Sequence, residues 1–474
     1  MSYKIALVGL PNVGKSSIFN LLSSQLKSNV APYPFSTIYP VKSIIYLPDE
    51  KLDKLNKLLL WWFRGSLESS KLIKKYCSLE LWDIAGIVPL DGTQDKTSEL
   101  GPTFLSHIRV SDLILLVVRA FSDHSVPPNI KTFLSERPEF YDILSQLDSF
   151  EKENNTQVEL DKSKELFEKY GLSDISFSNN TSHNSTLELH CSLEKSNIDD
   201  SVNIPKFSES ILEAQLVLMT LIKSDLEILS KTIQKYSKNL KTNEKKLKIL
   251  VPIKEELEQK KYVPISSLKS YTSLSSEDKE EINSLSLLSS KPIVLLANYG
   301  SSSESLEYLL EIQDWSKRHS LPFSSLNLEA EEIYSLLSSE EERREARESL
   351  YLKHSSKDKL FQVIKETLNL SSFYTFKLED KSGKKYSLIN WNWNLEPVSG
   401  EIRSWLFEKS EEKNYLYKCV ASIHNQLSEY FISSKLIESD KFVNLSPLQE
   451  FSGELITGSK NYKLQGGEIV QIIA

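Results

Sequence analysis

The stretch Gly9-Leu10-Pro11-Asn12-Val13-Gly14-Lys15-Ser16 follows an apolar run at residues 4–8 and precedes an amphipathic run at residues 17–22. It fills every fixed position of the pattern G-x-x-x-x-G-K-[ST], between a predicted buried strand and a predicted helix. The backbone N–H groups of such a loop and the positive N-terminus of the following helix cradle the phosphates of a nucleotide. The stretch therefore predicts an α/β P-loop fold with a mostly parallel sheet and helices on both faces.

The P-loop supplies most of the contacts that we expect with a nucleotide. Lys15 is expected to reach the β- and γ-phosphates, and the hydroxyl of Ser16 is expected to ligate Mg²⁺. The residues of this stretch predicted to bind nucleotide are Asn12, Val13, Gly14, Lys15, Ser16 and Ser17.

Two further elements match the metal and γ-phosphate side of such a site. An apolar strand at residues 79–83 ends in the pattern D-x-x-G, so Asp83 is expected to hold Mg²⁺ through water and the Gly86 N–H to sense the γ-phosphate. Thr37, in a proline-rich loop, is placed to complete the Mg²⁺ shell when a γ-phosphate is bound, although a rigid structural loop is the alternative. Ile87 stands where Ras-like GTPases carry the glutamine that orients the attacking water. Another residue must position that water.

Composition limits the classes of protein that the chain can belong to. Its 474 residues are enough for two or three domains, and its formal net charge of −8 argues against a surface that binds nucleic acid throughout. Cys77, Cys191 and Cys419 form no metal or redox spacing. No run approaches the roughly 18 apolar residues of a membrane span, and no signal region is evident. A cytoplasmic, reduced protein is expected.

Several stretches together resemble the YchF / Obg-like ATPase family. They are G-L-P-N-V-G-K-S at 9–16, Y-P-F-S-T-I at 33–38, W-D-I-A-G-I-V at 82–88 and L-G-P-T-F-L-S-H-I-R at 100–109. The resemblance implies an OBG-type nucleotide domain of the translation-factor class of P-loop NTPases, with a C-terminal TGS domain. It also implies Mg²⁺ as cofactor, a preference for ATP over GTP, and the ribosome as partner. His107 lies on the L-S-H-I-R motif, which makes it the candidate for the missing water-positioning or general-base role, although a lone histidine on a half-apolar helix is more often structural.

The base-binding element follows a second buried strand at residues 291–298. Asn298 ends this strand where P-loop GTPases have N-K-x-D and the resembled family has N-x-x-E, so Asn298 and Tyr299 are expected to contact the base. Ser301 replaces the acid that would pair with the N1 and N2 donors of guanine, and Glu304 is a poor substitute. Weak guanine specificity is expected, and adenine preference does not follow from this position alone.

The pattern divides the chain into five parts. We expect a nucleotide domain at 1–122 and 280–370, a low-complexity insertion at 123–205, a helical hairpin at 206–265 and a β-grasp TGS domain at 371–474. Pro252 is expected to kink or cap the returning helix of the hairpin.

Two features of these later parts have both a structural and a functional interpretation. The lysines of the hairpin could face solvent or touch RNA; they are Lys241, Lys245, Lys246 and Lys248. The tryptophans of the C-terminal part are expected in its core rather than on an RNA-binding face; they are Trp391, Trp393 and Trp405. Gly466-Gly467 is predicted to form a hairpin turn.

These features favour a monomeric, Mg²⁺-dependent nucleoside triphosphatase that hydrolyses ATP, and GTP less efficiently, as a ribosome-associated switch. Lys15, Gly86 and His107 are its predicted catalytic residues; Ser16, Thr37 and Asp83 are its predicted metal ligands. One alternative is a nucleotide-gated ribosome- or RNA-binding module whose hydrolysis is vestigial. A GTPase of the Obg or DRG kind is a second alternative, which Ser301 disfavours.

Overall fold

The computed structural model describes residues 3–23, 40–84, 100–121, 209–260, 263–337, 356–388, 395–410, 413–444 and 455–473, with isolated positions between 337 and 356. The predicted insertion at 123–205 lies outside these residues, as do Thr37, Gly86, Trp391 and Trp393.

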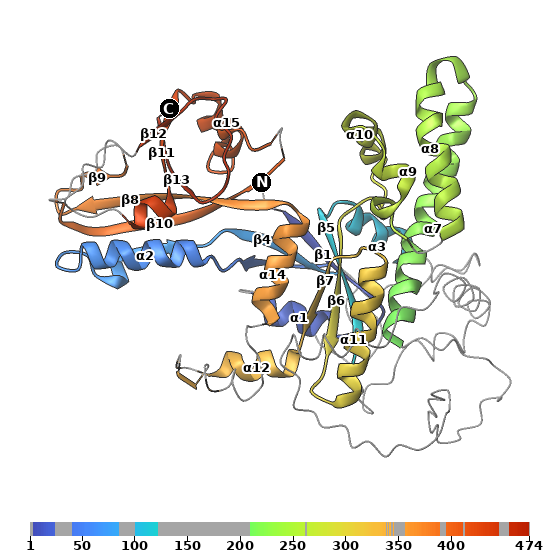
Figure 1. Cartoon of the computed structure of the whole chain (residues 1–474), viewed down its shortest axis with the longest axis horizontal. Helices are drawn as coiled ribbons and strands as arrows, with labels where there is room; N and C mark the ends of the chain where they lie inside the picture. Colours follow the sequence, from blue (N-terminus) through green and yellow to red (C-terminus); the bar gives the residue numbers. More distant parts are fainter. Residues whose placement is uncertain are drawn as a thin grey trace. The chain divides into compact units, whose positions relative to one another are not determined.

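Strands from both halves of the chain build a six-stranded sheet in the order β2-β4-β1-β5-β6-β7 (Figure 1). Every neighbouring pair is parallel except β2 with β4. The strands are β1 (Lys4–Val8), β2 (Val41–Tyr46), β4 (Ser78–Asp83), β5 (Leu113–Ala120), β6 (Ile293–Tyr299) and β7 (Phe323–Leu326). β1, β5 and β6 are almost wholly buried, as expected for central strands covered on both faces. The prediction of a P-loop α/β fold with a mostly parallel sheet is confirmed.

Helices from several parts of the chain pack on this sheet. They are α1 (Lys15–Leu22), α7 (Glu209–Ser237), α11 (Ser303–Arg318) and α14 (Ser356–Thr367). Helix α3 (Leu100–Arg109) precedes β5, and α12 (Leu328–Leu336) follows β7 and packs on α1. The first half of α7 is buried from Ser210 to Leu218 and packs on β5. The predicted hairpin helix therefore begins as a part of the nucleotide domain.

The second half of α7 pairs with α8 (Leu240–Lys260). Ile222 and Leu229 of α7 contact an apolar stripe of α8 that includes Leu250 and Ile253. The short helices α9 (Lys269–Thr272) and α10 (Ser276–Ser284) complete this small core. Pro252 lies inside α8 without ending it.

The C-terminal part forms a second sheet of seven strands. Its order is β12-β11-β13-β8-β10-β3, and β9 pairs with β8. The strands from this part are β8 (Leu370–Asp380), β9 (Lys385–Tyr386), β10 (Pro397–Glu408), β11 (Ser433–Glu438), β12 (Ile456–Gly458) and β13 (Glu468–Ile473), with the short helices α15 (Leu416–Val420), α16 (Asn425–Glu429) and α17 (Ser439–Val443).

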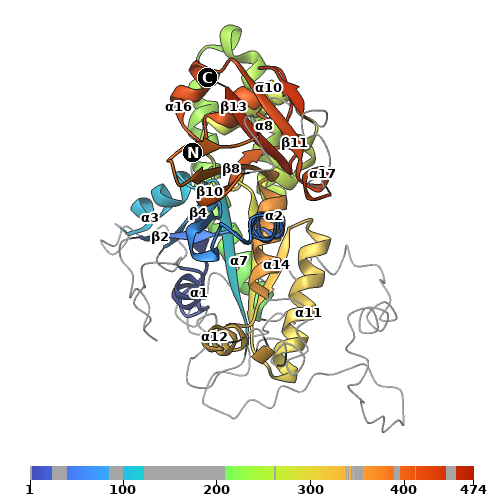
Figure 2. The same cartoon turned by 90° about the vertical axis from the view of Figure 1, so that its left-hand side faces the viewer.

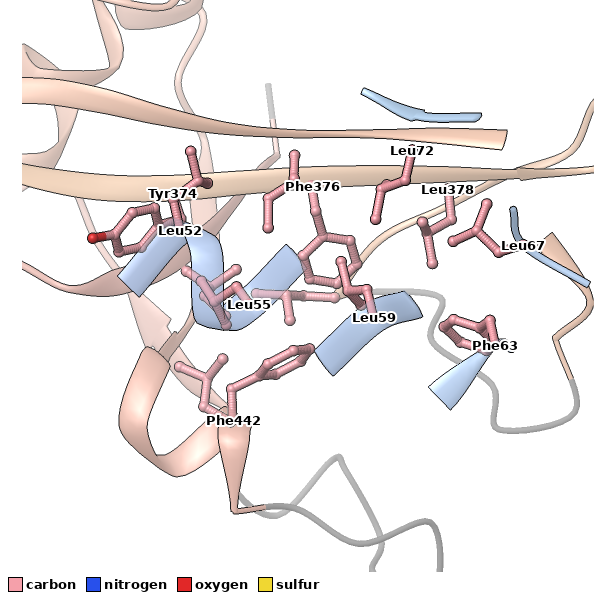
Figure 3. Packing of buried hydrophobic residues seen from close by; sticks show 14 of the residues in the cluster. Leu52, Leu55, Leu59, Phe63, Leu67, Leu72, Tyr374, Phe376, Leu378 and Phe442 are labelled. Carbon is pink, nitrogen blue, oxygen red and sulfur yellow. The ribbon is translucent and has the colours of Figure 1, made fainter. Parts of the chain in front are cut away.

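An excursion from the N-terminal half belongs to this second sheet. Strand β3 (Leu72–Lys75) pairs in parallel with β10, and helix α2 (Glu50–Trp62) packs alongside β8 and β10 (Figures 1 and 2). Leu52, Leu55 and Leu59 repeat at the spacing of one helix face. Figure 3 shows them between the side chains of β8 and Phe442. The predicted domain division, which placed residues 1–122 together, is therefore wrong for this excursion.

Hydrogen bonds fix where this helix begins. The Asp49 carboxylate accepts from the Leu52 N–H at 3.1 Å and from the Tyr374 hydroxyl at 2.8 Å. One side chain thus caps α2 and ties it to β8.

The turn before the last strand differs from the prediction. Gly466 and Gly467 have φ angles of 100° and 98°, which only glycine adopts easily. However, β11 lies between β12 and β13, so this turn does not join two paired strands. The predicted hairpin turn is wrong: the Glu468 carboxylate instead holds the loop through the N–H groups of Gln465 and Gly466.

Candidate nucleotide-binding site

The P-loop leaves β1 at the carboxyl edge of the first sheet, where ligands bind in open α/β sheets. Asn12 and Gly14 have φ angles of 62° and 94°, so the loop turns through two left-handed residues. A Cβ atom at Gly14 would come within 2.4 Å of the Asn298 amide nitrogen. The second glycine of the motif is therefore required both by its backbone angle and by a close neighbour.

Lys15 is folded into its own loop. Its ammonium donates to the carbonyl oxygens of Leu10, at 2.7 Å, and Gly9, at 3.2 Å, and the side chain is buried. Burial lowers the pKa of Lys15 to about 8, and the charges of Asp83 and Glu213 only partly oppose that shift. An anionic phosphate would offer this ammonium a stronger partner than two neutral carbonyls.

The predicted metal ligands Ser16 and Asp83 lie together. The Ser16 hydroxyl donates to the Asp83 carboxylate at 2.7 Å, and Asp83 is fully buried at the end of β4. A hydroxyl and a carboxylate are hard oxygen donors of the kind that Mg²⁺ prefers, and Mg²⁺ is usually held by one or two protein groups plus phosphate and water. This pair therefore fits the ion, and the described residues hold no cluster of three or more His, Cys, Asp or Glu that would form an all-protein cage.

The base-binding end of the site lies beside the P-loop. Asn298 is buried at the end of β6, and its amide donates to the carbonyl of Val13 at 3.1 Å. Leu328 would be 3.4 Å from a Cβ at Gly14, so it lines the same corner. Tyr299 follows Asn298, and burial raises its pKa. The predicted residues Val13, Gly14 and Asn298 are thus in direct contact, whereas Ser17 lies in the first turn of α1.

The structure adds residues that sequence reasoning did not select. Asn327 caps α12, with its oxygen accepting from the Ala330 N–H at 2.9 Å, and its amide nitrogen donates to the Ser301 hydroxyl at 3.3 Å. A polar residue suited to cap a helix, directly before residues 328–336, was the only signal.

Glu213 was missed for a different reason. It lies in the buried half of α7 and accepts from the backbone N–H of Arg119 at 2.8 Å. Burial raises its pKa to about 8. Its contact with β5 joins positions 94 residues apart, which no local pattern reveals.

The helix that carries His107 is fixed at its C-terminal end by Arg109. His107 is half-buried on α3, and among the described residues it makes no hydrogen bond or ion pair. Arg109 donates to the carbonyl of Ser286 at 2.7 Å and to the hydroxyl of Ser224 at 2.8 Å. It also lies 3.8 Å from the buried carboxylate of Asp225. The L-S-H-I-R motif is thereby tied to α7, while the structure does not bring His107 to a P-loop side chain.

The lysines predicted as a basic cluster on the hairpin are largely paired with acids. Lys245 lies 3.0 Å from Asp278 and Lys246 lies 2.7 Å from Glu281, both on α10. Lys248 pairs with Glu244 of its own helix at 2.7 Å. These pairs favour a solvated, charge-balanced surface over a phosphate-binding one.

Trp405 lies within the second sheet. Its indole N–H donates to the Thr375 hydroxyl at 2.9 Å, and the Arg403 guanidinium lies 3.8 Å from its ring centroid. Trp405 is half-buried, and these contacts already use both the edge and the face of its indole ring.

Among the described helices, not one combines the length and the apolar character that a membrane crossing requires.

Comparison with known proteins agrees with this geometry. The family model described as 50S ribosome-binding GTPase matches residues 4–158. The Ribosome-binding ATPase YchF of Mycoplasma genitalium is 24% identical over 98% of this chain and 96% of its own length. The protein of the same name from Bacillus subtilis is 24% identical over 99% of this chain and 98% of its own length. Obg-like ATPase 1 of Oryza sativa subsp. indica is 27% identical over 68% of this chain and 60% of its own length.

The fold has a solved counterpart. The YchF GTPase of Schizosaccharomyces pombe superposes with a TM-score of 0.62 at 21% identity, over 100% of this chain and 98% of that one. The six-stranded sheet carries the candidate site at one edge. The P-loop lies there, together with the ends of the strands that carry Asp83 and Asn298. The chain is thus similar to YchF proteins over nearly the full length of both chains.

Proposed function

We propose that this chain is a Mg²⁺-dependent nucleoside triphosphatase that hydrolyses ATP, and GTP less efficiently, as a ribosome-associated switch. One observation carries the proposal: Lys15, the Ser16–Asp83 pair and Asn298 lie along one edge of the sheet. Subsites for phosphate, metal and base therefore follow each other in the order in which a nucleotide presents these groups.

The residues of this edge have separate roles in the proposal. Lys15 exchanges its loop carbonyls for the β- and γ-phosphate oxygens, and the backbone N–H groups of residues 12–17 surround the phosphates. Ser16, Asp83 and Thr37 would hold Mg²⁺, and the bound ion would supply positive charge beside the phosphates. The Gly86 N–H binds the γ-phosphate, and Asn298 and Tyr299 contact the base.

His107 is the proposed positioning group for the attacking water. The residue that follows Gly86 is Ile87, whose aliphatic side chain can neither accept nor donate a hydrogen bond. His107 lies on the helix that begins at Leu100, after the D-x-x-G pattern in the chain, and its ring has no competing partner among the described residues. An imidazole in that role would take or orient the proton of the water as it attacks the γ-phosphate.

The names of the relatives support the wider role. Those of the bacterial relatives describe a ribosome-binding ATPase. That of the fission-yeast structure describes a GTPase. We propose the ribosome as partner, a cytoplasmic location and a monomeric state. The helical pair α7–α8 and the second sheet, as a TGS-type domain, would dock on that partner. Any contact with RNA would then be made by residues other than the lysines of α8 that pair with acids.

Turnover and affinity of a His107→Ala variant test this mechanism. We expect kcat for ATP to fall about 100-fold or more, because general acid–base groups contribute about 10²–10⁴-fold, while ATP affinity changes little. Ser106→Ala, on the exposed neighbouring position of the same helix, is the matched control and should retain full turnover. An unchanged kcat in His107→Ala would remove this residue from the mechanism.

A second candidate function is a nucleotide-gated binding module with vestigial hydrolysis, which Ile87 favours. Co-sedimentation with ribosomes in the presence of ATP, ADP or a non-hydrolysable ATP analogue separates the two. A switch enzyme should release the ribosome as it hydrolyses ATP and remain bound with the analogue. A binding module should give the same result with ATP and with the analogue, and His107→Ala should not alter it.

A further inference from the structure

Two polar side chains meet where neighbouring strands of the first sheet end. Ser301 follows β6, and Asn327 directly follows β7. The strands are parallel and in register, with Asn298 opposite Leu326, so both residues emerge at the same edge. The Asn327 amide nitrogen lies 3.3 Å from the Ser301 hydroxyl oxygen.

This pair borders the corner assigned to the base. Asn298, three residues before Ser301, holds the Val13 carbonyl of the P-loop. Leu328, the residue after Asn327, would be 3.4 Å from a Cβ at Gly14. Ser301 itself is exposed, so its hydroxyl is accessible from solvent at that corner.

The direction of the hydrogen bond between the two side chains is fixed. The Asn327 oxygen accepts from the Ala330 N–H at 2.9 Å, and a backbone N–H can only donate. The other end of the amide is therefore its NH₂ group, which donates to the Ser301 oxygen. With its oxygen engaged as an acceptor, the Ser301 hydroxyl has its hydrogen available to donate to a ligand.

We infer that Ser301, oriented by Asn327, reads the Watson–Crick edge of the base by donating to N1 of adenine. This inference rests on the proposed nucleotide function. Adenine N1 is an acceptor and can use this hydrogen, whereas guanine carries a hydrogen on N1 and leaves the hydroxyl hydrogen without an acceptor there. An acid at the same position would have the reverse preference. The pair thus gives this chain an adenine preference without the acid that its motif lacks.

The nearby carboxylates are occupied elsewhere or lie outside this arrangement. Glu304 accepts from the Tyr308 hydroxyl at 2.6 Å, one turn further along α11. Glu331 is buried and accepts from the Ser356 hydroxyl at 2.7 Å and the Lys357 N–H at 3.2 Å. Glu329 is exposed in the first turn of α12, and an ionised carboxylate accepts hydrogen bonds but cannot donate one to N1.

The test compares binding of ATP, GTP and 1-deaza-ATP, which has a C–H group in place of N1, each with Mg²⁺. The full-length wild-type chain should bind 1-deaza-ATP about 3- to 10-fold more weakly than ATP, the usual loss for one hydrogen bond. Ser301→Ala should bind the two equally, because it has no donor to lose.

Two further variants test the orienting role and the reversal of preference. Asn327→Asp keeps an oxygen for the Ala330 N–H but offers Ser301 an acceptor, so the Ser301 hydroxyl should turn away and the discrimination against 1-deaza-ATP should vanish. Ser301→Asp should raise the affinity for GTP relative to ATP by about 10-fold or more.

Three outcomes would overturn the inference, and they are distinct. Equal wild-type affinity for ATP and 1-deaza-ATP excludes a donor to N1 while leaving the nucleotide function in place. Discrimination that survives in Ser301→Ala assigns the donor to N1 to another group. Failure of the wild-type chain to bind any of the three nucleotides refutes the proposed function itself.

Discussion

The nucleotide edge of the first sheet and the core of the second sheet are built in opposite ways. At the nucleotide edge, Lys15 bonds to carbonyls five and six residues before it. In the second core, Leu52, Leu55 and Leu59 of α2 pack on Tyr374 and Phe376 of β8, more than 300 residues along the chain (Figure 3). Local contacts thus hold the Lys15 side chain in its loop, whereas the second core exists only after distant segments have met.

The two regions also differ in what they bury. Around the nucleotide edge, ionisable side chains are taken out of water; they include Lys15, Asp83, Arg119 and Glu213. The second core is lined by leucine, isoleucine and aromatic side chains. Its buried acids accept backbone hydrogen bonds: Asp49 caps α2, and Glu468 holds the loop before β13. Buried charge costs stability and apolar burial provides it, so the first region is organised for binding and the second for stability.

The largest effect should come from opening the second core. Leu55→Ala removes a side chain that is 1% exposed, and we expect a loss of about 2–5 kcal/mol in the free energy of unfolding. Urea denaturation measures this loss, and Lys54→Ala, on the exposed face of the same helix, is the control. ATP affinity should remain within about 2-fold, because sites without shared contacts behave independently.

Hydrogen exchange shows which sheet α2 stabilises. In Leu55→Ala, protection should fall in β8 and β10 and be retained in β1 and β5. The opposite pattern would return residues 50–75 to the nucleotide domain, as the sequence-based division placed them.

The same contrast explains what could be predicted from the sequence. The local pattern at residues 9–16 predicts both a fold and a function. The strand before the loop and the helix after it lie where that pattern predicts them. Leu52, Leu55 and Leu59 have the spacing of one apolar helix face, which was not used to divide the chain into domains, and periodicity does not identify the partner of such a face. The excursion was therefore assigned to the wrong sheet.

The residues of the candidate site also differ in whether a local sequence pattern identifies them. Ser16 and Asp83 could be paired in advance because the P-loop and the D-x-x-G strand each have a motif. Asn327 and Glu213 have no motif, and their roles come from contacts across 26 and 94 residues. The lysines of α8 looked like a patch because their acidic partners on α10 follow some 30 residues later.

A smaller effect is expected from removing the charge at the phosphate site. Lys15→Ala should weaken ATP binding about 10- to 100-fold, the value of one or two charge-assisted hydrogen bonds. The free energy of unfolding should change by only about 1 kcal/mol, since the lost bonds to Gly9 and Leu10 are offset by relief of a buried charge. Titration of a fluorescent ATP analogue and urea denaturation give the two values. A loss of stability as large as that of Leu55→Ala would contradict the division between a binding region and a stabilising one.

The smallest expected effect is a dependence of the free energy of unfolding on pH, caused by Glu213 at the nucleotide edge. Burial raises the pKa of Glu213 to about 8 from an unfolded value of 4.5. Between these two pH values the native state keeps a proton that the unfolded state has released, so stability falls as pH rises. Glu213→Gln keeps an oxygen for the Arg119 N–H but does not titrate. Relative to this variant, the wild type should lose on the order of 1–3 kcal/mol between pH 5 and pH 8.

Urea denaturation of both proteins across this pH range provides the measurement. Glu227→Gln, at an exposed position of the same helix, should follow the wild type. If the difference between wild type and Glu213→Gln did not change with pH, Glu213 would be ionised in the native state throughout. The carboxylate would then be stabilised by the Arg119 N–H and by Lys15 as strongly as by water, and the nucleotide edge would bury its charges without a cost in stability.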